Sequence, residues 1–230
     1  MAKSIGIIGG LGPRTAFQFS QRINDRFTFA TKIQPNLLLE NLPVSDEMLE
    51  RMTKGDSCPE ILKLMLDSIH KLNSAGVDLI VIPCNTVHVF IDSLRNNSRV
   101  PILSIIEETT KICEGNKLKI MGILGSNTTI KQKLYRDSLS GKRIKTIMPR
   151  AEEQEAINDI IFRINRDKVH FSDQGRLLEI IQNLNARGAE TVLLACTDLQ
   201  QIIFTKDTTV PLMDSFAILE ERVFRFLIEG

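Results

Sequence analysis

Two cysteines in this chain occupy matching positions, and their residue type suits proton-transfer chemistry. Cys84 directly follows the apolar segment 78–83, and Cys196 directly follows the apolar segment 191–195. A free thiol titrates at about 8.5, and its pKa shifts with the surroundings, so a cysteine can act as an acid or as a base near neutral pH. Two thiols on opposite sides of a ligand carbon could remove a proton from one face and return one to the other. We therefore take Cys84 and Cys196 as candidate catalytic residues for inverting a carbon centre; the alternative is that both are small buried hydrophobic residues.

Polar residues follow both cysteines. Asn85 and Thr86 come after the first, and Thr197 and Asp198 come after the second. Together with backbone N–H groups at a helix start, such side chains could hold a carboxylate and the negative charge that grows on it during proton removal. Asp198 could also tune the thiols. His88 lies about one helical turn after the first cysteine and could do the same, or it could simply pack or cap a helix.

The two halves of the sequence resemble each other. The matching blocks are 5–10 with 121–126, 72–86 with 184–198, and 100–104 with 210–214. The second pair contains both cysteines at one offset, and the third pair keeps nearly the same offset. Chance similarity of helix–strand units is the alternative, but the near-constant spacing favours a repeat. Because open α/β sheets bind ligands at the carboxyl ends of their strands, the repeat predicts two thiols that face each other across a ligand.

Short apolar stretches alternate with helical patterns along the whole chain. The expected strands are 3–9, 36–40, 78–83, 101–106, 118–125 and 191–195. The expected helices start at Thr15 and cover 59–75, 151–165, 172–187 and 216–229. The predicted fold class is α/β, with two similar, pseudo-twofold-related lobes, each a mainly parallel sheet flanked by helices. Lobe one is expected to comprise 1–112 and 210–230 and to carry Cys84, and lobe two to comprise 113–209 and to carry Cys196.

The bulk composition limits the partners. The 230 residues carry a net charge of +1, with 43% hydrophobic and 25% charged residues, which is ordinary for a globular protein. Without a field of one sign, nucleic acid and anionic membranes are not expected partners. The apolar runs are too short to span a membrane, and the N-terminus is unlike a signal peptide. We expect a cytoplasmic protein with reduced cysteines, in which Cys58 and Cys113 serve packing, and no metal site, because the three histidines lack ligand spacing.

Three motifs support a more specific interpretation. They are GGLGP at 9–13, PCNTVH at 83–88 and ACTDL at 195–199. Together they resemble the aspartate/glutamate racemase superfamily, most closely its aspartate racemase branch, over essentially the whole chain. The resemblance implies an isomerase that needs neither pyridoxal phosphate nor another cofactor and interconverts L- and D-amino acids, with Cys84 and Cys196 as the acid–base pair. It also implies a homodimer, and substrate contacts from Gly10, Asn85, Thr86, Thr128 and Thr197.

Some positions depart from the family pattern. Asp198 stands where the second motif usually has Glu. Our alignment places Glu47 and Glu155 where aspartate racemases resemble one another in having cations for the substrate's side-chain carboxylate. Both glutamates are therefore candidate substrate-binding residues, and they favour a neutral or basic amino acid over aspartate. Arg14, in the glycine-rich turn, could supply a cation instead.

Other functions within this resemblance stay open. A hydantoin racemase is one alternative. Related superfamily decarboxylases tend to lack one cysteine, whereas this chain keeps both. A non-catalytic amino-acid-binding protein is a further alternative. A redox-sensing cysteine pair would require the sulfurs to approach within about 2 Å on oxidation, too close for an amino acid between them.

Overall fold

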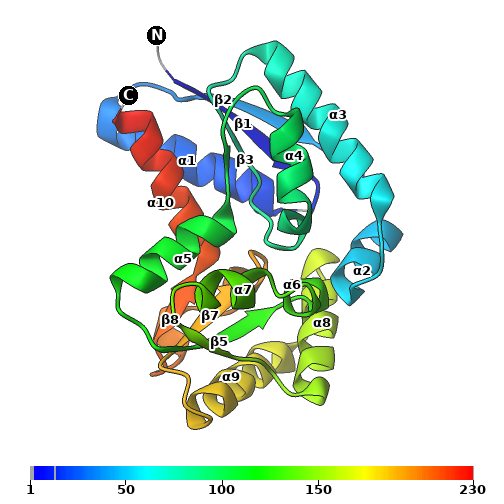
Figure 1. Ribbon diagram of the computed structural model, residues 1–230, viewed down its shortest axis with the longest axis vertical. Coiled ribbons are helices and arrows are strands. Elements are labelled where there is room, and N and C mark those ends of the chain that lie inside the picture. Colours follow the sequence, from blue (N-terminus) through cyan, green and yellow to red (C-terminus); the bar gives the residue numbers. More distant parts are fainter. Residues whose placement is uncertain (1–2, 13, 230) are drawn as a thin grey trace.

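Two α/β lobes make up the protein. The computed structural model describes residues 3–12 and 14–229, and Figure 1 shows the lobes one above the other. The strands of lobe one are β1 (Ser4–Gly9), β2 (Asn36–Asn41), β3 (Leu79–Val81) and β4 (Ile102–Leu103), in the order β2-β1-β3-β4. The strands of lobe two are β5 (Ile120–Gly125), β6 (Lys145–Ile147), β7 (Thr191–Ala195) and β8 (Leu212–Asp214), in the order β6-β5-β7-β8. All pairings are parallel, and the two orders correspond strand for strand. The predicted fold class, two similar lobes with parallel sheets, is confirmed.

Helices cover both faces of each sheet. Those of lobe one are α1 (Thr15–Thr31), α2 (Asp46–Lys54), α3 (Pro59–Ala75), α4 (Ile91–Asn97), α5 (Ile105–Gly115) and α10 (Ser215–Ile228). Those of lobe two are α6 (Asn127–Lys131), α7 (Leu134–Ser140), α8 (Ala151–Asn165) and α9 (Phe171–Ala186). Short 3₁₀ turns are η1 (Thr86–Phe90), η2 (Leu199–Gln201) and η3 (Thr205–Asp207). The turns η1 and η2 follow β3 and β7, the strands that end just before the cysteines.

The central strands β1, β3, β5 and β7 are buried on both faces, as their uninterrupted apolar sequences predict. In β7, Val192 and Leu194 pack into a core with α8 and α9, whereas Leu193 and Ala195 pack into a second core. That second core also contains side chains of α1, α5 and α10 from lobe one, so it joins the lobes. The strand ends are therefore held on a continuous apolar scaffold rather than on separate, loosely tethered units.

Most expected helices are found within a residue or two of their predicted ends. Helix α3 begins at Pro59, whose fixed φ suits the first helical turn, and stops at Gly76, whose φ of 71° lies in the left-handed region. The helices α2, α4 and α7 and the strands β6 and β8 were not predicted, because each is short. The expected strand 101–106 is shorter than predicted, since α5 begins at Ile105 with Ser104 as its N-cap.

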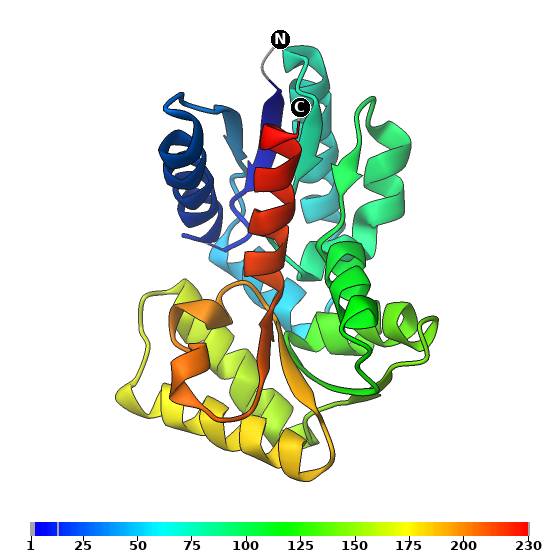
Figure 2. The same ribbon diagram turned by 90° about the vertical axis from the view of Figure 1, so that its left-hand side faces the viewer.

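One expected boundary is wrong. Strand β8 pairs with β7, so the chain after residue 210 first completes the sheet of lobe two. Only α10 returns to lobe one, where it packs against α1 and α5 (Figure 2). The repeat already contained this information, because the block at 210–214 matches the block at 100–104, which contains β4.

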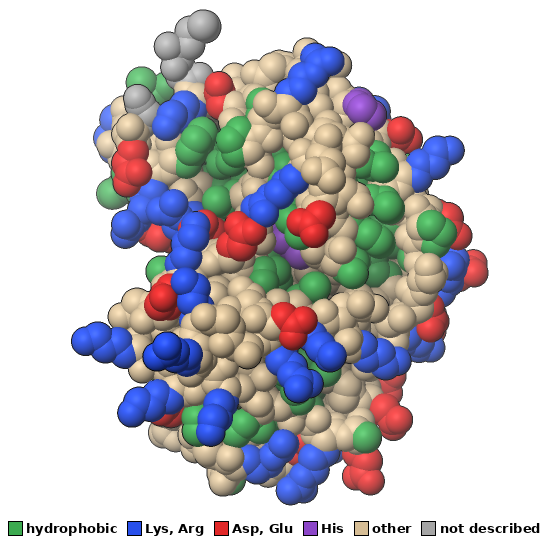
Figure 3. All heavy atoms as spheres, viewed as in Figure 1, with side chains coloured by type: hydrophobic (Ala, Val, Ile, Leu, Met, Phe, Trp, Pro, Cys, Tyr) green, Lys and Arg blue, Asp and Glu red, His purple; other side chains and the backbone are tan. Residues whose placement is uncertain are grey.

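Charges of both signs are mixed over the face drawn in Figure 3, on both lobes. Among the helices that the structure describes, none combines the length and the apolar character needed to cross a membrane.

Candidate active site

The carboxyl ends of β3 and β7 bring the two cysteines to one small cavity between the lobes. Cys84 is partly buried, and Cys196 is buried. The cavity has a volume of about 20 Å³. Its lining residues are Leu11, Leu49, Met52, Thr53, Cys84, Asn85, Thr86, Ser126, Ile161, Asn165, Cys196, Thr197 and Asp198. Of the residues expected from the sequence, both thiols and all four polar residues that follow them thus lie together.

The two thiols have equivalent surroundings. Burial raises the pKa of Cys84 to about 11 and raises the pKa of Cys196 well above its usual value. In each case the backbone N–H groups two and three residues further along oppose this rise: those of Thr86 and Val87 for Cys84, and the matching pair for Cys196. These N–H groups stabilise a thiolate when one forms. The raised pKa values favour the protonated form of both thiols.

Asp198 is a buried carboxylate beside both thiols. Its oxygens accept hydrogen bonds from the hydroxyl of Thr15 and, at 3.4 Å, from Nε2 of Gln201, and the thiol of Cys196 lies 3.9 Å from Oδ2. All of these donors are neutral. Burial raises the pKa of Asp198 to about 6, and its charge contributes to the raised pKa of both thiols. The site therefore holds an anion at pH 7 without a cation among these hydrogen-bonding partners.

Reciprocal hydrogen bonds join the lobes at the cavity. Thr86, after β3, lies 2.9 Å from the hydroxyl of Ser126, at the start of the first helix after β5. Asp198, after β7, accepts from Thr15, at the start of the first helix after β1. The Thr197 hydroxyl also donates to the carbonyl of Pro83 at 3.1 Å. Each lobe thus uses the residues after its cysteine strand to contact the other lobe.

Asn85 is held in one orientation by a buried network. Its Oδ1 accepts from the hydroxyl of Tyr135 at 2.5 Å, and its Nδ2 donates to Ser215 at 3.0 Å. The hydroxyl of Ser215 in turn donates to the carbonyl of Leu194 at 2.8 Å. The amide nitrogen carries a second hydrogen that can be donated to a ligand. The network fixes the direction in which Asn85 can present it.

His88 forms hydrogen bonds with backbone groups rather than with the thiol of Cys84. The amide of Ile105 donates to its Nε2 at 3.2 Å, so the proton of the neutral ring is on Nδ1, which donates to the carbonyl of Cys84 at 2.8 Å. Burial lowers the pKa of His88 to about 4. His88 is thus a neutral bridge between the cysteine turn and the start of α5, which agrees with the packing and capping alternative.

The buried, neutral state of His88 leads to a stability prediction. The unfolded chain gains a proton at this side chain near pH 6.5, but the folded protein does not until about pH 4. Its contribution to the free energy of unfolding therefore falls as the pH drops through this window, by up to about 3 kcal/mol. We expect His88→Gln to be less stable than the parent at pH 7 by about 1–3 kcal/mol, with a smaller deficit at pH 4.5. Urea unfolding at both pH values measures this, with His70→Gln on the exposed side of α3 as the control; an equal deficit at both would contradict the neutral bridge.

Two expected substrate contacts have structural roles. Gly10 has a φ of 83°, and a Cβ there would lie 2.3 Å from the carbonyl oxygen of Leu42, so only glycine fits this turn. Thr128 is buried behind the cavity wall, where its hydroxyl donates to the carbonyl of Met52. Neither residue is among those that line the cavity.

The expected substrate contacts of Glu47 and Glu155 stay predictions. Both side chains are exposed, and neither belongs to the lining. Glu155 lies about 120° around α8 from Ile161, which does line the cavity. Arg14 is also outside the lining: its guanidinium pairs with Asp167 across the lobes at 2.6 Å.

The sequence did not indicate the residues that α2 and α8 contribute to the cavity lining, which we call the distal end. These are Leu49, Met52 and Thr53 on α2 and Ile161 and Asn165 on α8. On each helix they are spaced by three or four residues and so share one face. Helix α2 was not predicted, and the length of α8 alone could not say which of its faces meets the other lobe.

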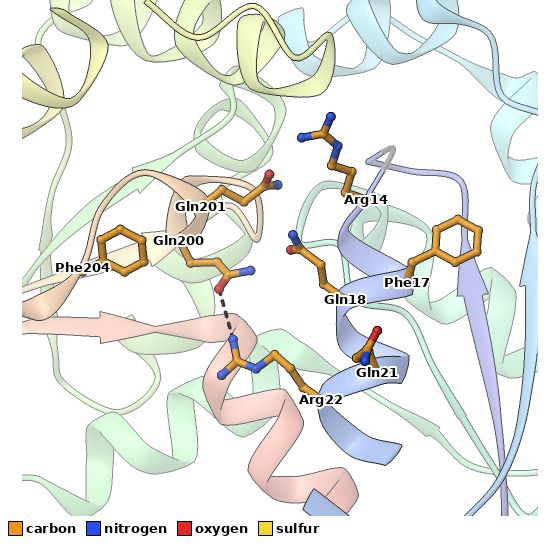
Figure 4. Close-up of a pocket in the computed structure, with 8 residues that line it drawn as sticks. All are labelled: Arg14, Phe17, Gln18, Gln21, Arg22, Gln200, Gln201 and Phe204. Atoms are coloured by element: carbon orange, nitrogen blue, oxygen red, sulfur yellow. Dashed lines mark hydrogen bonds between the residues drawn. The ribbon is translucent and has the colours of Figure 1, made fainter. Parts of the chain in front are cut away.

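A wider hollow of about 660 Å³ lies between α1 and the η2 turn (Figure 4). Its lining residues are Arg14, Phe17, Gln18, Gln21, Arg22, Gln200, Gln201 and Phe204. Gln201 belongs to this hollow and also donates to Asp198, so its side chain lies between the two spaces. The thiol cavity has room for about one water, so it must widen before it can hold an amino acid.

In the described part of the chain, no group of three or more His, Cys, Asp and Glu side chains is arranged to hold a metal ion.

Comparisons with known proteins agree with this architecture. The family model for Asp/Glu/Hydantoin racemase matches residues 8–222. The broad specificity amino-acid racemase RacX of Bacillus subtilis is 28% identical over 223 residues, which cover 94% of each chain. Among solved structures, a Yersinia pestis protein with a proposed Asp/Glu racemase activity superposes with a TM-score of 0.84 at 24% identity, over 98% of this chain and 99% of that one. The Picrophilus torridus aspartate racemase superposes with a TM-score of 0.76 at 23% identity, over 99% of this chain and 93% of that one. The structural likenesses show the fold, and the match of the family model over nearly the whole chain shows that this protein belongs to the Asp/Glu/Hydantoin racemase family of isomerases.

Proposed function

We propose that this protein racemises an amino acid by moving the α-proton between Cys84 and Cys196, without a cofactor. The observation that carries the proposal is that both thiols line the same small cavity, each at the carboxyl end of an equivalent strand. Each thiol also has the same pair of N–H groups to stabilise its thiolate. A reaction that needs an acid on one face of a carbon and a base on the other matches this symmetry.

The polar residues that line the cavity can be assigned to the two charged groups of an amino acid, its α-ammonium and its α-carboxylate. The α-ammonium is the cation that the buried carboxylate of Asp198 lacks. Thr197 also suits it, because its hydroxyl hydrogen already bonds to Pro83 and only its lone pairs are free. Asn85 and Thr86, on the opposite lobe, then receive the α-carboxylate, with the second amide hydrogen of Asn85 as a donor.

The entering ammonium would start the reaction. Burial and Asp198 raise the pKa of both thiols, whereas a positive charge beside them lowers their pKa and allows one to lose its proton to solvent water. That thiolate removes the α-proton, and the charge left on the substrate is stabilised by donors at its carboxylate. The other thiol gives its proton to the opposite face, so the two sulfurs end with exchanged protonation states. The opposite enantiomer reacts through the reverse sequence.

The most direct test is α-hydrogen exchange in D₂O. Reduced protein is incubated with single enantiomers of a panel of amino acids, without pyridoxal phosphate or metal, and deuterium gain is followed by mass spectrometry alongside optical purity. We expect at least one amino acid to gain deuterium at Cα while it loses optical purity. Folded, reduced protein that exchanges no amino acid would contradict the proposal and favour a hydantoin or other related substrate, which the same assay can test.

The name of the Bacillus subtilis relative supports a substrate beyond aspartate and glutamate. Hydantoin racemisation is the second candidate, favoured only by the breadth of the matching family model. The homodimer and the cytoplasmic location stay predictions.

A further inference from the structure

The distal end of the cavity contains a buried oxygen atom without a partner. Asn165, the last residue of α8, lines the cavity. Its Oδ1 is inaccessible to solvent and accepts no hydrogen bond from the described residues. A buried acceptor left unpaired is unfavourable, so a ligand that donates a hydrogen bond to it would be stabilised.

The rest of the distal end is uncharged. Leu49 and Met52 from α2 and Ile161 from α8 are apolar, and Thr53 is the other polar residue there. The one charged side chain in the lining is Asp198, which comes from the turn after β7 and is assigned to the α-ammonium. A substrate side chain at the distal end therefore meets neither a cation nor an anion.

The nearest cation in sequence is directed elsewhere. Arg166, which follows Asn165, stacks over the ring of Phe162 at 3.3 Å and bonds Asp46 on α2 at 3.2 Å. Its other terminal nitrogen lies 4.0 Å from Glu50. The guanidinium of Arg166 thus already pairs with two carboxylates, those of Asp46 and Glu50, outside the cavity. A substrate carboxylate in the cavity would be buried without a cation, which is unfavourable.

From these observations we infer that the distal end selects an amino acid with an uncharged side chain that donates a hydrogen bond, such as an amide or a hydroxyl, with Asn165 as the residue that determines this specificity. The inference rests on the proposed racemase function. An acidic side chain has no donor hydrogen and no cation to meet. A cationic side chain could donate to Asn165 but would be buried without an anion.

Isosteric substrates separate these possibilities without any mutation. Asparagine, aspartate and leucine have the same branched shape but carry, respectively, a donor, a negative charge and neither; threonine and valine form a second matched pair. The rate of α-hydrogen exchange in D₂O gives kcat/KM for each. We expect the donor side chain to exceed both its charged and its apolar isostere by about tenfold or more. Faster exchange of aspartate, glutamate or lysine than of every uncharged donor would overturn the inference while leaving the racemase in place. If no amino acid exchanges, the proposed function fails, and this inference fails with it.

Variants at Asn165 test the residue itself. Asn165→Leu should reduce the preference for asparagine over leucine by about tenfold while leaving exchange of leucine measurable. Asn165→Lys should place a cation in the distal end and raise the kcat/KM of aspartate relative to asparagine. Gln182→Lys, an exposed amide-to-cation change on α9, is the matched control and should alter neither ratio. If the ratio of kcat/KM for asparagine to that for leucine were unchanged in a folded Asn165→Leu protein, a group other than Asn165 would determine the side-chain preference.

Discussion

Replacement of either Cys84 or Cys196 by serine is expected to abolish racemisation while the protein stays folded. A serine hydroxyl is a far weaker acid than a thiol, so it cannot accept or supply the α-proton at useful rates. General acid–base groups contribute about 10²–10⁴ to a rate, and loss of one member of the pair should lower kcat/KM for racemisation by about 10³ or more. The measurement is the loss of optical purity from each pure enantiomer.

The two serine variants should each retain α-hydrogen exchange with a different enantiomer. The cysteine that remains can still remove the α-proton from the enantiomer that faces it and return deuterium to the same face in D₂O. One variant should therefore exchange the α-hydrogen of the L-amino acid without inversion, and the other that of the D-amino acid. This pairing of each thiol with one enantiomer is the signature of two bases on opposite faces, and it identifies which cysteine serves which hand.

The other two cysteines provide matched controls. Cys58 and Cys113 are buried free thiols outside the cavity. Cys58→Ala and Cys113→Ala should keep racemisation of both enantiomers near the parental rate, although Cys113 contacts Met213 and its loss should lower the melting temperature. Identical exchange of both enantiomers by Cys84→Ser and Cys196→Ser would argue for a single shared base and against the two-thiol mechanism.

The two cysteines of the site and the residues that follow them could be predicted from the sequence, and the structure explains why. The repeat places Cys84 and Cys196 after equivalent strands, and strand ends in parallel sheets converge at one edge. The residues that follow each cysteine were predicted for the same reason, since they start the turn at that edge. Local sequence and topology are sufficient here because each residue's position is set by the strand directly before it.

The residues of the distal end could not be predicted, because the rotation of α2 and α8 about their axes and the packing of the lobes determine which side chains reach the cavity. Leu49 and Met52 sit on a helix of nine residues, too short for its periodicity to stand out. Asn165 lies on a helix whose bounds were predicted, but its contact with the cavity depends on how lobe two meets α2 of lobe one. An alignment with few anchors instead selected Glu47 and Glu155, which lie on the exposed sides of the same two helices.

Replacement of Asp198 by asparagine is expected to stabilise the fold above pH 6. Burial raises the pKa of this carboxyl to about 6 in the folded protein, against 3.8 ordinarily. The folded state thus holds its proton over a range in which the unfolded state has lost it, so the parent loses stability as the pH rises from 3.8 to 6, by up to about 3 kcal/mol. An asparagine side chain does not titrate in this range, so Asp198→Asn does not lose stability in this way as the pH rises. The gain in the unfolding free energy of Asp198→Asn should be largest at pH 7–8 and should vanish near pH 3.5. His88 acts in the opposite direction over part of this range, so the variant must be compared with the parent at each pH.

The same substitution should impair activity in a way that a purely structural role would not. Without the carboxylate the α-ammonium has no anionic partner, and removing one partner of a buried charge pair costs about 2–5 kcal/mol, or roughly 30-fold or more in kcat/KM. Asp198 also raises the pKa of both thiols. The alkaline rise of kcat/KM, which reports a thiol of the free enzyme, should therefore move to lower pH in Asp198→Asn even as its maximum falls.

Stability and activity together distinguish this role of Asp198 from simple packing. A carboxylate kept for packing would give a variant with lower stability and an unshifted pH profile. Asp137→Asn, an exposed carboxylate on α7, is the control and should change neither quantity. A more stable, less active variant with its alkaline limb at lower pH would mean that the protein accepts an unpaired buried anion, at a cost to its fold, because the substrate supplies the missing cation. An alkaline limb that stays in place would instead mean that the charge of Asp198 does not govern the thiols, and the proposed order of events, with the ammonium triggering ionisation, would have to be abandoned.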